Sequence, residues 1–223
     1  MIRRTKRTLL QAYWGLRATP GEIAFDVRYH VRTWRGIRWL PRGRPRREAF
    51  AHARAYEGTA AAEVTTLLSY LPDDLRAFTF IDLGCGAGKA LLIAWAHGFC
   101  RLVGVELSPR FVALARQNVI RYRGPKGSGE VEITEGDARA VTFPDGPIVV
   151  FLYDPFDGTV MREVVERLTG SLRLSPRQAY VLYHVPLERS YWDASPLKVV
   201  HESQWNVVYA FDGSTGGSLA PES

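Results

Sequence analysis

Acidic side chains stand where three successive apolar runs of the chain end. Asp82 lies near the end of the first run, and Glu106 and Asp137 follow the next two. Because the carboxyl ends of parallel strands meet at one edge of a sheet, we expect the three carboxylates to lie close together. Carboxylates accept hydrogen bonds from the vicinal hydroxyls of a ribose or from an amino base, and they repel pyrophosphate. The spacing therefore predicts a site for a ligand with a ribose, an amino base and a positively charged portion.

A glycine-rich segment, Gly84-Cys-Gly-Ala-Gly88, follows the first apolar run and precedes a predicted helix. Glycines let the backbone turn sharply and approach a ligand, and the start of a helix offers unpaired N–H groups. A phosphate-binding P-loop is excluded because Leu83 and Ala90 stand where that motif needs Gly and Ser or Thr. A dinucleotide-binding turn is disfavoured because its third glycine would fall on Lys89.

Two further sets of residues that could take part in a reaction follow the fourth and fifth apolar runs. Asp154 and its backbone carbonyl would accept hydrogen bonds from an NH group and orient the nitrogen lone pair, and Phe156 would cover a planar or cationic acceptor. His184 would serve as a general base, since the ordinary pKa of histidine, about 6.5, suits proton transfer at neutral pH. The alternative is structural: Pro155 turns the chain, Phe156 packs in the core and His184 is a satisfied buried histidine.

The elements that must position these groups alternate along the chain from Glu57. Strand, helix and strand in succession with short connections predict parallel strands with right-handed crossovers, hence an α/β, doubly wound sheet with helices on both faces. The predicted strands are 78–83, 101–105, 131–134, 148–153 and 179–183, with a terminal hairpin of 197–201 and 207–211. The predicted helices are 59–70, capped by Thr59, then 88–97, 111–122, led by Ser108 and Pro109, and 160–172.

The front of the chain differs from the rest in charge. The 223 residues carry a formal net charge of +6, but residues 1–54 hold 14 basic and 3 acidic residues, or +11, which leaves −5 for the rest. We predict an amphipathic surface helix over 1–21 and a half-exposed strand over 25–32, where apolar and polar residues alternate. The expected division is a basic N-terminal extension (1–55), a main domain (56–212) and a flexible polar tail (213–223).

Composition excludes several classes of protein. With 46% hydrophobic and 23% charged residues the chain is neither a disordered protein nor a disulfide-stapled miniprotein. Its two cysteines, Cys85 and Cys100, fit a reducing compartment, so we expect a cytoplasmic protein, and no spacing of Cys or His predicts a metal site. No apolar run approaches the ~20 residues that a membrane span needs.

Four ordered motifs resemble those of the class I S-adenosylmethionine (SAM)-dependent methyltransferases over about residues 56–211. They are Phe80–Gly88, Gly104–Leu107, Gly136–Ala138 and Phe151–Phe156. The resemblance implies a seven-stranded, Rossmann-like sheet whose last strand is antiparallel, with SAM lying across the strand ends. The string Tyr153-Asp154-Pro155-Phe156 is similar to the Asn/Asp-Pro-Pro-Tyr/Phe motif of members that methylate amino groups, although it has one proline instead of two.

The resemblance also implies roles for single residues. Asp82, Gly84 and Gly86 would face the methionine portion of SAM, Glu106 the ribose, and Asp137 with Ala138 the adenine. The segment containing Tyr56 and Thr59 resembles one that closes over the methionine end. The residues expected to bind the cofactor are Tyr56, Thr59, Asp82, Leu83, Gly84, Cys85, Gly86, Gly88, Glu106, Leu107, Asp137, Ala138 and Asp154, and those expected to act on the acceptor are Asp154, Pro155, Phe156 and His184.

Three hypotheses of function remain open at this point. The first is a SAM-dependent methyltransferase acting on nitrogen, either of a protein side chain such as lysine or of a small amine. The second is an RNA or DNA methyltransferase that uses the basic extension, although 25 of the 29 basic residues are arginine, as in proteins from GC-rich genomes. The third is a non-catalytic SAM-binding module.

Overall fold

The computed structural model describes residues 20–34, 52 and 59–213. Its centre is a seven-stranded sheet with the strand order β3-β2-β1-β4-β5-β7-β6. Only β7 runs antiparallel to its neighbours β5 and β6, which confirms the mostly parallel, Rossmann-like sheet with one reversed strand. The strands are β1 (Thr79–Leu83), β2 (Arg101–Glu106), β3 (Glu130–Glu135), β4 (Ile148–Tyr153), β5 (Ala179–His184), β6 (Lys198–Glu202) and β7 (Asn206–Phe211).

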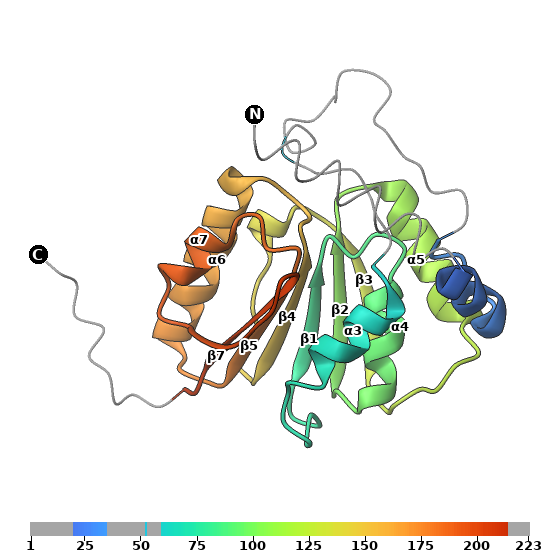
Figure 1. The fold of residues 1–223 in the computed structure, drawn as a ribbon, viewed down its shortest axis with the longest axis horizontal. Helices are drawn as coiled ribbons and strands as arrows, with labels where there is room; N and C mark the ends of the chain where they lie inside the picture. The colour runs from blue at the N-terminus through green and yellow to red at the C-terminus, as the bar shows by residue number, and fades with distance from the viewer. Residues whose placement is uncertain (1–19, 35–51, 53–58, 214–223) are drawn as a thin grey trace, which may run out of the picture.

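Helices cover both faces of this sheet (Figure 1). On one face lie α3 (Ala61–Leu68), α4 (Lys89–Ala94) with the 3-10 turn Trp95–His97, and α5 (Pro109–Arg121). On the other face lie the 3-10 turn Ala138–Ala140, α6 (Gly158–Leu174) and α7 (Arg189–Asp193). The central strands are buried on both sides, which explains why β1 and β4 appear in the sequence as continuous apolar runs without alternation.

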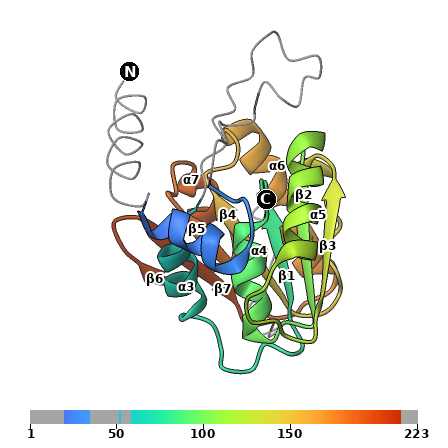
Figure 2. The ribbon, with the colours of Figure 1, turned by 90° about the vertical axis from the view of Figure 1, so that its right-hand side faces the viewer.

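A helix over residues 20–29 stands where the sequence predicted a strand over 25–32, so that prediction is wrong. The burial of Glu22, Phe25, Asp26 and Tyr29 follows the spacing of one helix face, and Val27, apolar in the alternating pattern, is 65% exposed. Figure 2 shows this helix across the outer side of the layer formed by α3, α4 and α5. The predicted helix over 1–21 lies largely outside the described residues.

Two predicted helix caps also differ from the structure. Thr59 does not cap α3: the cap position is Ala60, and the Ala61 N–H donates instead to Glu22 Oε1 over 3.0 Å. The Ser108 side chain makes no cap bond to α5, although Pro109 occupies the first turn as predicted. At α3 the distant Glu22 carboxylate thus takes the place of the local hydroxyl, whereas at α5 the Ser108 N–H donates to Glu106 Oε1 over 2.8 Å.

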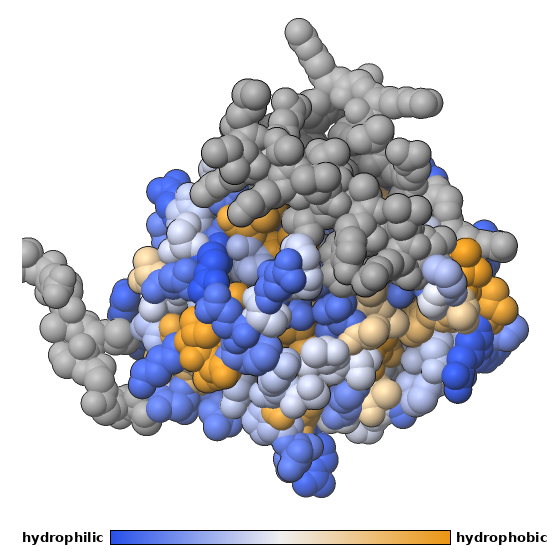
Figure 3. Space-filling model, in the orientation of Figure 1, coloured by the Kyte–Doolittle hydropathy of each residue, from blue (hydrophilic) through white to orange (hydrophobic). Residues whose placement is uncertain are grey.

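The surface shown in Figure 3 is hydrophilic, with apolar residues in small separate groups. Within the described ranges, no helix combines the length and the apolar character that crossing a bilayer requires. The expected boundaries at residues 55 and 212 stay predictions.

Candidate functional site

The turn after β1 is built from glycines in conformations that other residues rarely adopt. Gly84, Gly86 and Gly88 have φ angles of 81°, 52° and 82°. The N–H groups of Gly84 and Cys85 both donate to the Val105 carbonyl of β2, at 2.8 and 3.1 Å. The turn is thereby fixed at the carboxyl edge of the sheet, beside the end of β2.

Glu106 ties the ends of three elements together. Its Oε2 accepts from the Gly86 N–H at 2.9 Å, and its Oε1 accepts from the Ser108 N–H at 2.8 Å. Its backbone carbonyl accepts from the Gly136 N–H at 3.0 Å, which brings the end of β3 to the same place. Because a carboxylate has about four acceptor sites, Glu106 keeps acceptor capacity for a ribose hydroxyl.

Asp82 and Glu106 form an acidic centre under the glycine turn. Asp82 is 4% exposed. Burial raises the pKa of Asp82 well above its ordinary value, and the charge of Glu106 raises it further. Burial also raises the pKa of Glu106, against the lowering effect of the hydrogen bonds from Ser108 and Gly86. Two carboxylates held this way favour a ligand that brings positive charge close to them.

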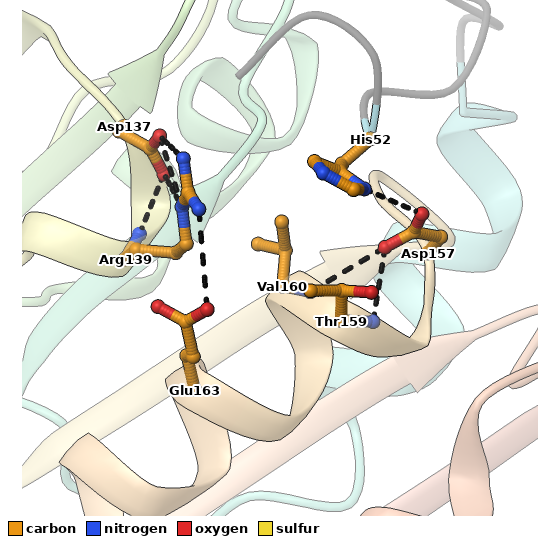
Figure 4. Close-up of polar contacts among 7 residues, drawn as sticks. All are labelled: His52, Asp137, Arg139, Asp157, Thr159, Val160 and Glu163. Atoms are coloured by element: carbon orange, nitrogen blue, oxygen red, sulfur yellow. Dashed lines mark hydrogen bonds and ion pairs between the residues drawn. The ribbon is translucent and has the colours of Figure 1, made fainter. Parts of the chain in front are cut away.

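Asp137 caps the 3-10 turn that follows β3 and is held by Arg139. Arg139 donates its backbone N–H to Asp137 Oδ1 at 2.9 Å, and its guanidinium contacts both carboxylate oxygens, the shortest contact being 2.8 Å (Figure 4). Burial raises the pKa of Asp137, but the hydrogen bonds from Arg139 outweigh it and leave the pKa below its ordinary value. An adenine amino group would therefore share this carboxylate with a guanidinium, a partner that the sequence pattern did not indicate.

The loop after β4 touches the glycine turn. A Cβ atom placed on Gly84 would lie 2.7 Å from the Cβ of Pro155, so only glycine fits against this proline. Asp154 is 8% exposed and has a φ of 35°, in the left-handed region that non-glycine residues seldom occupy outside functional sites. Phe156 is 5% exposed and belongs to the core on the α6 side, so its predicted stacking on an acceptor stays a prediction.

His52, for which no spacing in the chain indicated a role, is joined to this same loop. Its Nδ1 lies 2.8 Å from Asp157 Oδ2, and its carbonyl accepts from the Asp157 N–H at 3.0 Å. The other oxygen of Asp157 caps α6 through the N–H groups of Thr159 and Val160 (Figure 4). The imidazole thus lies above the start of α6, on the side where Asp137 and Arg139 stand.

His184, the candidate base at the end of β5, is 2% exposed. Its Nδ1 lies 2.7 Å from Asn206 Oδ1, and the Asn206 amide donates to Glu63 Oε2 of α3 at 3.0 Å. Burial lowers the pKa of His184, while the hydrogen bond with Asn206 opposes the shift. This arrangement favours a neutral imidazole fixed in one orientation.

The segment 20–34 supports the glycine turn from outside. Glu22 and the Lys89 ammonium, at the first residue of α4, form an ion pair in which both side chains are almost fully buried. Burial lowers the pKa of Lys89 to about 7. Asn118 of α5 donates to the carbonyls of Arg32 and Ala87, at 3.1 and 2.9 Å, and accepts from the Arg32 N–H. No spacing rule connects these residues, so the sequence did not reveal them.

The remaining predicted site residues differ in how deeply they are buried. Leu83 and Cys85 are core residues below the turn, and burial raises the pKa of the Cys85 thiol, which makes it a poor nucleophile. Thr59 and Ala138 are buried, and Leu107 is half-buried at the end of β2. Tyr56 lies outside the described residues.

These residues fit SAM. The glycine cradle leaves no room for a Cβ at Gly84, Glu106 keeps acceptor capacity for a ribose, and the buried Asp82 suits a ligand with an ammonium and a sulfonium charge. The site lies outside the carboxyl ends of β1, β2 and β4, where the strand order reverses and where ligands bind in such sheets.

Comparisons with known proteins agree with this geometry. Residues 80–173 match the family model described as a methyltransferase domain. The mouse 7SK snRNA methylphosphate capping enzyme is 34% identical over 67 residues, which cover 30% of this chain and 10% of that protein. The chain therefore spans about a tenth of the length of this curated relative.

Solved methyltransferase structures share the fold. A candidate RNA methyltransferase from Pyrococcus horikoshii has a TM-score of 0.52 at 17% identity, covering 88% of this chain and 96% of that chain. The ribosomal protein L11 methylase from Lactobacillus delbrueckii subsp. bulgaricus has a TM-score of 0.51 at 12% identity, covering 73% and 81% of the two chains. These likenesses show the fold, and the matched domain identifies residues 80–173 as a methyltransferase domain of the class I SAM-dependent type.

Proposed function

We propose that this methyltransferase transfers the methyl group of SAM to a nitrogen atom of its acceptor. When bound, SAM supplies a methyl group on a positively charged sulfur. The acceptor nitrogen forms a bond to the methyl carbon as the bond from that carbon to sulfur breaks, and the nitrogen loses a proton to water or to a base. Asp154 and its carbonyl would accept the N–H groups and aim the lone pair, so that catalysis consists mainly of positioning.

The observation that carries this proposal is the position of Asp154. It is the first residue after β4, its φ of 35° is unusual, and the next residue, Pro155, packs against Gly84 of the cofactor turn. An acceptor held by Asp154 would therefore lie next to the methionine end of SAM. A buried carboxylate also offsets the positive charge that develops on an alkylated amine.

The test compares Asp154→Ala and Asp154→Asn with Asp145→Ala as the control. Asp145 is exposed in the connection that precedes β4, at the opposite end of the strand. Each protein is incubated with methyl-tritiated SAM and a panel of lysine peptides, small amines and oligonucleotides. We expect both Asp154 variants to lose transfer by about a hundredfold or more when SAM is saturating, so that the loss lies in the reaction and not in the occupancy of the cofactor site.

The chemical form of the transferred label decides between acceptor atoms. N-methyl groups survive mild alkali, whereas methyl esters release methanol. C-methyl groups and O-methyl ethers also survive alkali, so the stable label is hydrolysed and compared with methylated standards. Label that depends on Asp154 and co-elutes with an N-methylated standard supports transfer to nitrogen. Label in an ester, an O-methyl or a C-methyl product, or full activity of Asp154→Ala, overturns the proposal.

A nucleic acid is the second candidate for the molecule that carries the acceptor atom. The mouse relative is named as an enzyme of an snRNA, and the Pyrococcus horikoshii protein as a candidate RNA methyltransferase. Label in the oligonucleotides of the same panel, and none in the peptides or amines, would favour this candidate.

A further inference from the structure

The helix over 20–29 and α5 form one continuous outer surface. The Arg123 N–H donates to the Tyr29 carbonyl at 3.1 Å, and the rings of Tyr29 and Tyr122 lie 5.4 Å apart. Tyr122 stacks on Trp95 at 6.2 Å, and Phe25 meets Tyr29 edge to face at 4.9 Å. These four rings form a seam between the helix 20–29 and the layer of α4 and α5.

Five exposed basic side chains border this seam, and we call them the basic face. They are Arg28, Arg32, Arg121, Arg123 and Lys126. Arg28 lies over the Tyr29 ring at 5.4 Å, and Lys126 lies over the Trp95 ring at 4.8 Å. Among the described residues, none of the five forms an ion pair, in contrast to Arg76, Arg101, Arg139 and Arg189.

Among the residues that the structure describes, the segments that form the basic face carry no exposed acidic side chain. Between Glu106 and Glu130 the sequence contains five basic residues and no acidic one. Glu22 and Asp26, the acidic residues of the segment 20–34, are buried and held by Lys89 and by Thr33 with Trp34. The helix α6, on the opposite side of the sheet, instead mixes three arginines with two glutamates. The positive charge is therefore concentrated on one side of the domain.

We infer that the basic face is a docking surface for single-stranded nucleic acid, whose phosphates pair with the five basic side chains. A helix of 13 residues such as α5 extends for about 20 Å, which matches a run of several nucleotides. Val27 and Ile120, 65% and 77% exposed, lie on the same two helices and offer apolar contacts to unpaired bases. Two isolated apolar side chains are too few to anchor a lipid surface.

The basic face is also joined to the catalytic edge. Asn118 bridges Arg32 and the carbonyl of Ala87 in the glycine turn, so one end of the surface lies beside the cofactor site. A strand bound along α5 would therefore lead toward the edge where methyl transfer takes place. This inference concerns binding and does not depend on the acceptor atom being nitrogen.

The experiment measures fluorescence anisotropy of a labelled oligouridylate of about 20 nucleotides, longer than the sites of about 4–16 nucleotides that single-strand binding folds occupy. Binding is titrated between about 50 and 200 mM salt. If all five side chains neutralise a phosphate, the logarithm of affinity falls with the logarithm of salt with a slope of about −3.5, at about −0.7 per phosphate. The double variant R121Q/R123Q is expected to reduce the slope by about 1.4 and the affinity by at least about tenfold.

The matched control is R162Q/R173Q, which removes two exposed arginines from α6. It is expected to bind the oligonucleotide like the unaltered protein, and both double variants are expected to bind SAM normally. Equal loss in the two double variants, no binding at low salt, or binding to anionic vesicles but not to the oligonucleotide would each overturn the inference. None of these results bears on the Asp154 experiment, so the two proposals fail separately.

Discussion

Gly84 and Pro155 are in contact at the centre of the carboxyl edge, where a Cβ on Gly84 would lie 2.7 Å from the Cβ of Pro155. Gly84 begins the turn that faces the methionine end of the cofactor, and Pro155 follows the proposed acceptor-orienting Asp154. Any shift of one loop must therefore move the other. Through this contact, two residues 71 positions apart in the chain hold the cofactor turn and the acceptor loop in a fixed relative position.

Replacing Gly84 by alanine is expected to weaken SAM binding. The added Cβ meets a proline ring that cannot move aside as a flexible side chain would, at a φ of 81° that disfavours alanine. Gly170→Ala is the control, because nothing lies within 4 Å of a Cβ there and the residue is inside α6. We expect the control to gain roughly 0.5–1 kcal/mol of unfolding free energy. Calorimetric titration with SAM and thermal unfolding measure both effects, and normal SAM affinity of Gly84→Ala would contradict the packing argument.

SAM binding is expected to release protons and to strengthen as pH rises through the raised pKa values of Asp82 and Glu106. Burial raises the pKa of Asp82 and of Glu106, so in the free protein these carboxyls hold protons at a pH above the ordinary carboxyl range. A cationic ligand stabilises their charged forms and lowers both pKa values. Titrations in buffers of different ionisation enthalpy measure the number of protons exchanged. Proton uptake, or affinity that falls as pH rises through this window, would show that the acidic centre does not face the cation.

The same carboxyls make the ligand-free protein less stable as pH rises. Because their pKa values are higher in the folded state than in the unfolded one, the folded state holds more protons between the two values. The unfolding free energy should therefore decline from the ordinary carboxyl range upward, and Asp82→Asn should reduce this decline. Urea unfolding at several pH values without SAM measures it, and an unchanged pH profile of the variant would count against a buried, charged Asp82.

Removing Asn118 is expected to loosen the segment 20–34 from the glycine turn. Asn118→Ala loses two donated bonds and one accepted bond, and it leaves the buried carbonyl of Ala87 and the partly buried backbone groups of Arg32 without this partner. We expect a loss of about 3 kcal/mol in unfolding free energy. Gln117→Ala, an exposed neighbour on α5, is the control and should change stability little. Hydrogen exchange that stays slow in residues 31–34 of Asn118→Ala would argue against this anchor.

The ion pair of Glu22 and Lys89 should show its role through pH. Glu22→Gln leaves a buried ammonium without its counter-charge, which typically costs about 3–5 kcal/mol. Burial lowers the pKa of Lys89, so the variant should regain stability as pH rises and the ammonium loses its proton. Adding Lys89→Met should remove the pH dependence. A pH-independent loss in Glu22→Gln would mean that the lost hydrogen bond to α3, and not the charge, is responsible.

The sequence predicted the strands whose side chains are buried on both faces of the sheet. It did not predict the contacts between segments that are far apart in the chain. The strand over 148–153 was predicted with its correct bounds, because six apolar residues in a row fit a strand that is buried on both faces of a sheet. The helix over 20–29 was missed because its apolar residues also alternate with polar ones, as they do in a strand. Only the packing of Phe25 and Tyr29 against other elements shows that the helical spacing is the one used.

The same limit applies to the site. Asp82, Glu106 and Asp137 were predicted at one edge from the order of the strands alone. The partner of Asp157 is 105 residues away, that of Glu22 is 67 residues away, and that of Asn118 is 86 residues away. No local pattern contains such pairs, because the fold brings them together. The sequence therefore indicates the cofactor chemistry better than it indicates how the front of the chain supports it.

Calorimetric titration of SAM into Glu106→Gln tests most directly whether this edge of the sheet is the cofactor site. The substitution keeps the side-chain shape and one acceptor oxygen for the backbone, but it removes the charge that would bind the ribose hydroxyls. We expect about tenfold or greater weakening, since a hydrogen bond to a charged group contributes about 1.5–3 kcal/mol. Glu132→Gln, an exposed acid on β3 paired with Arg101, should bind like the unaltered protein. Unchanged affinity in Glu106→Gln, or equal weakening in Glu132→Gln, would contradict the site described.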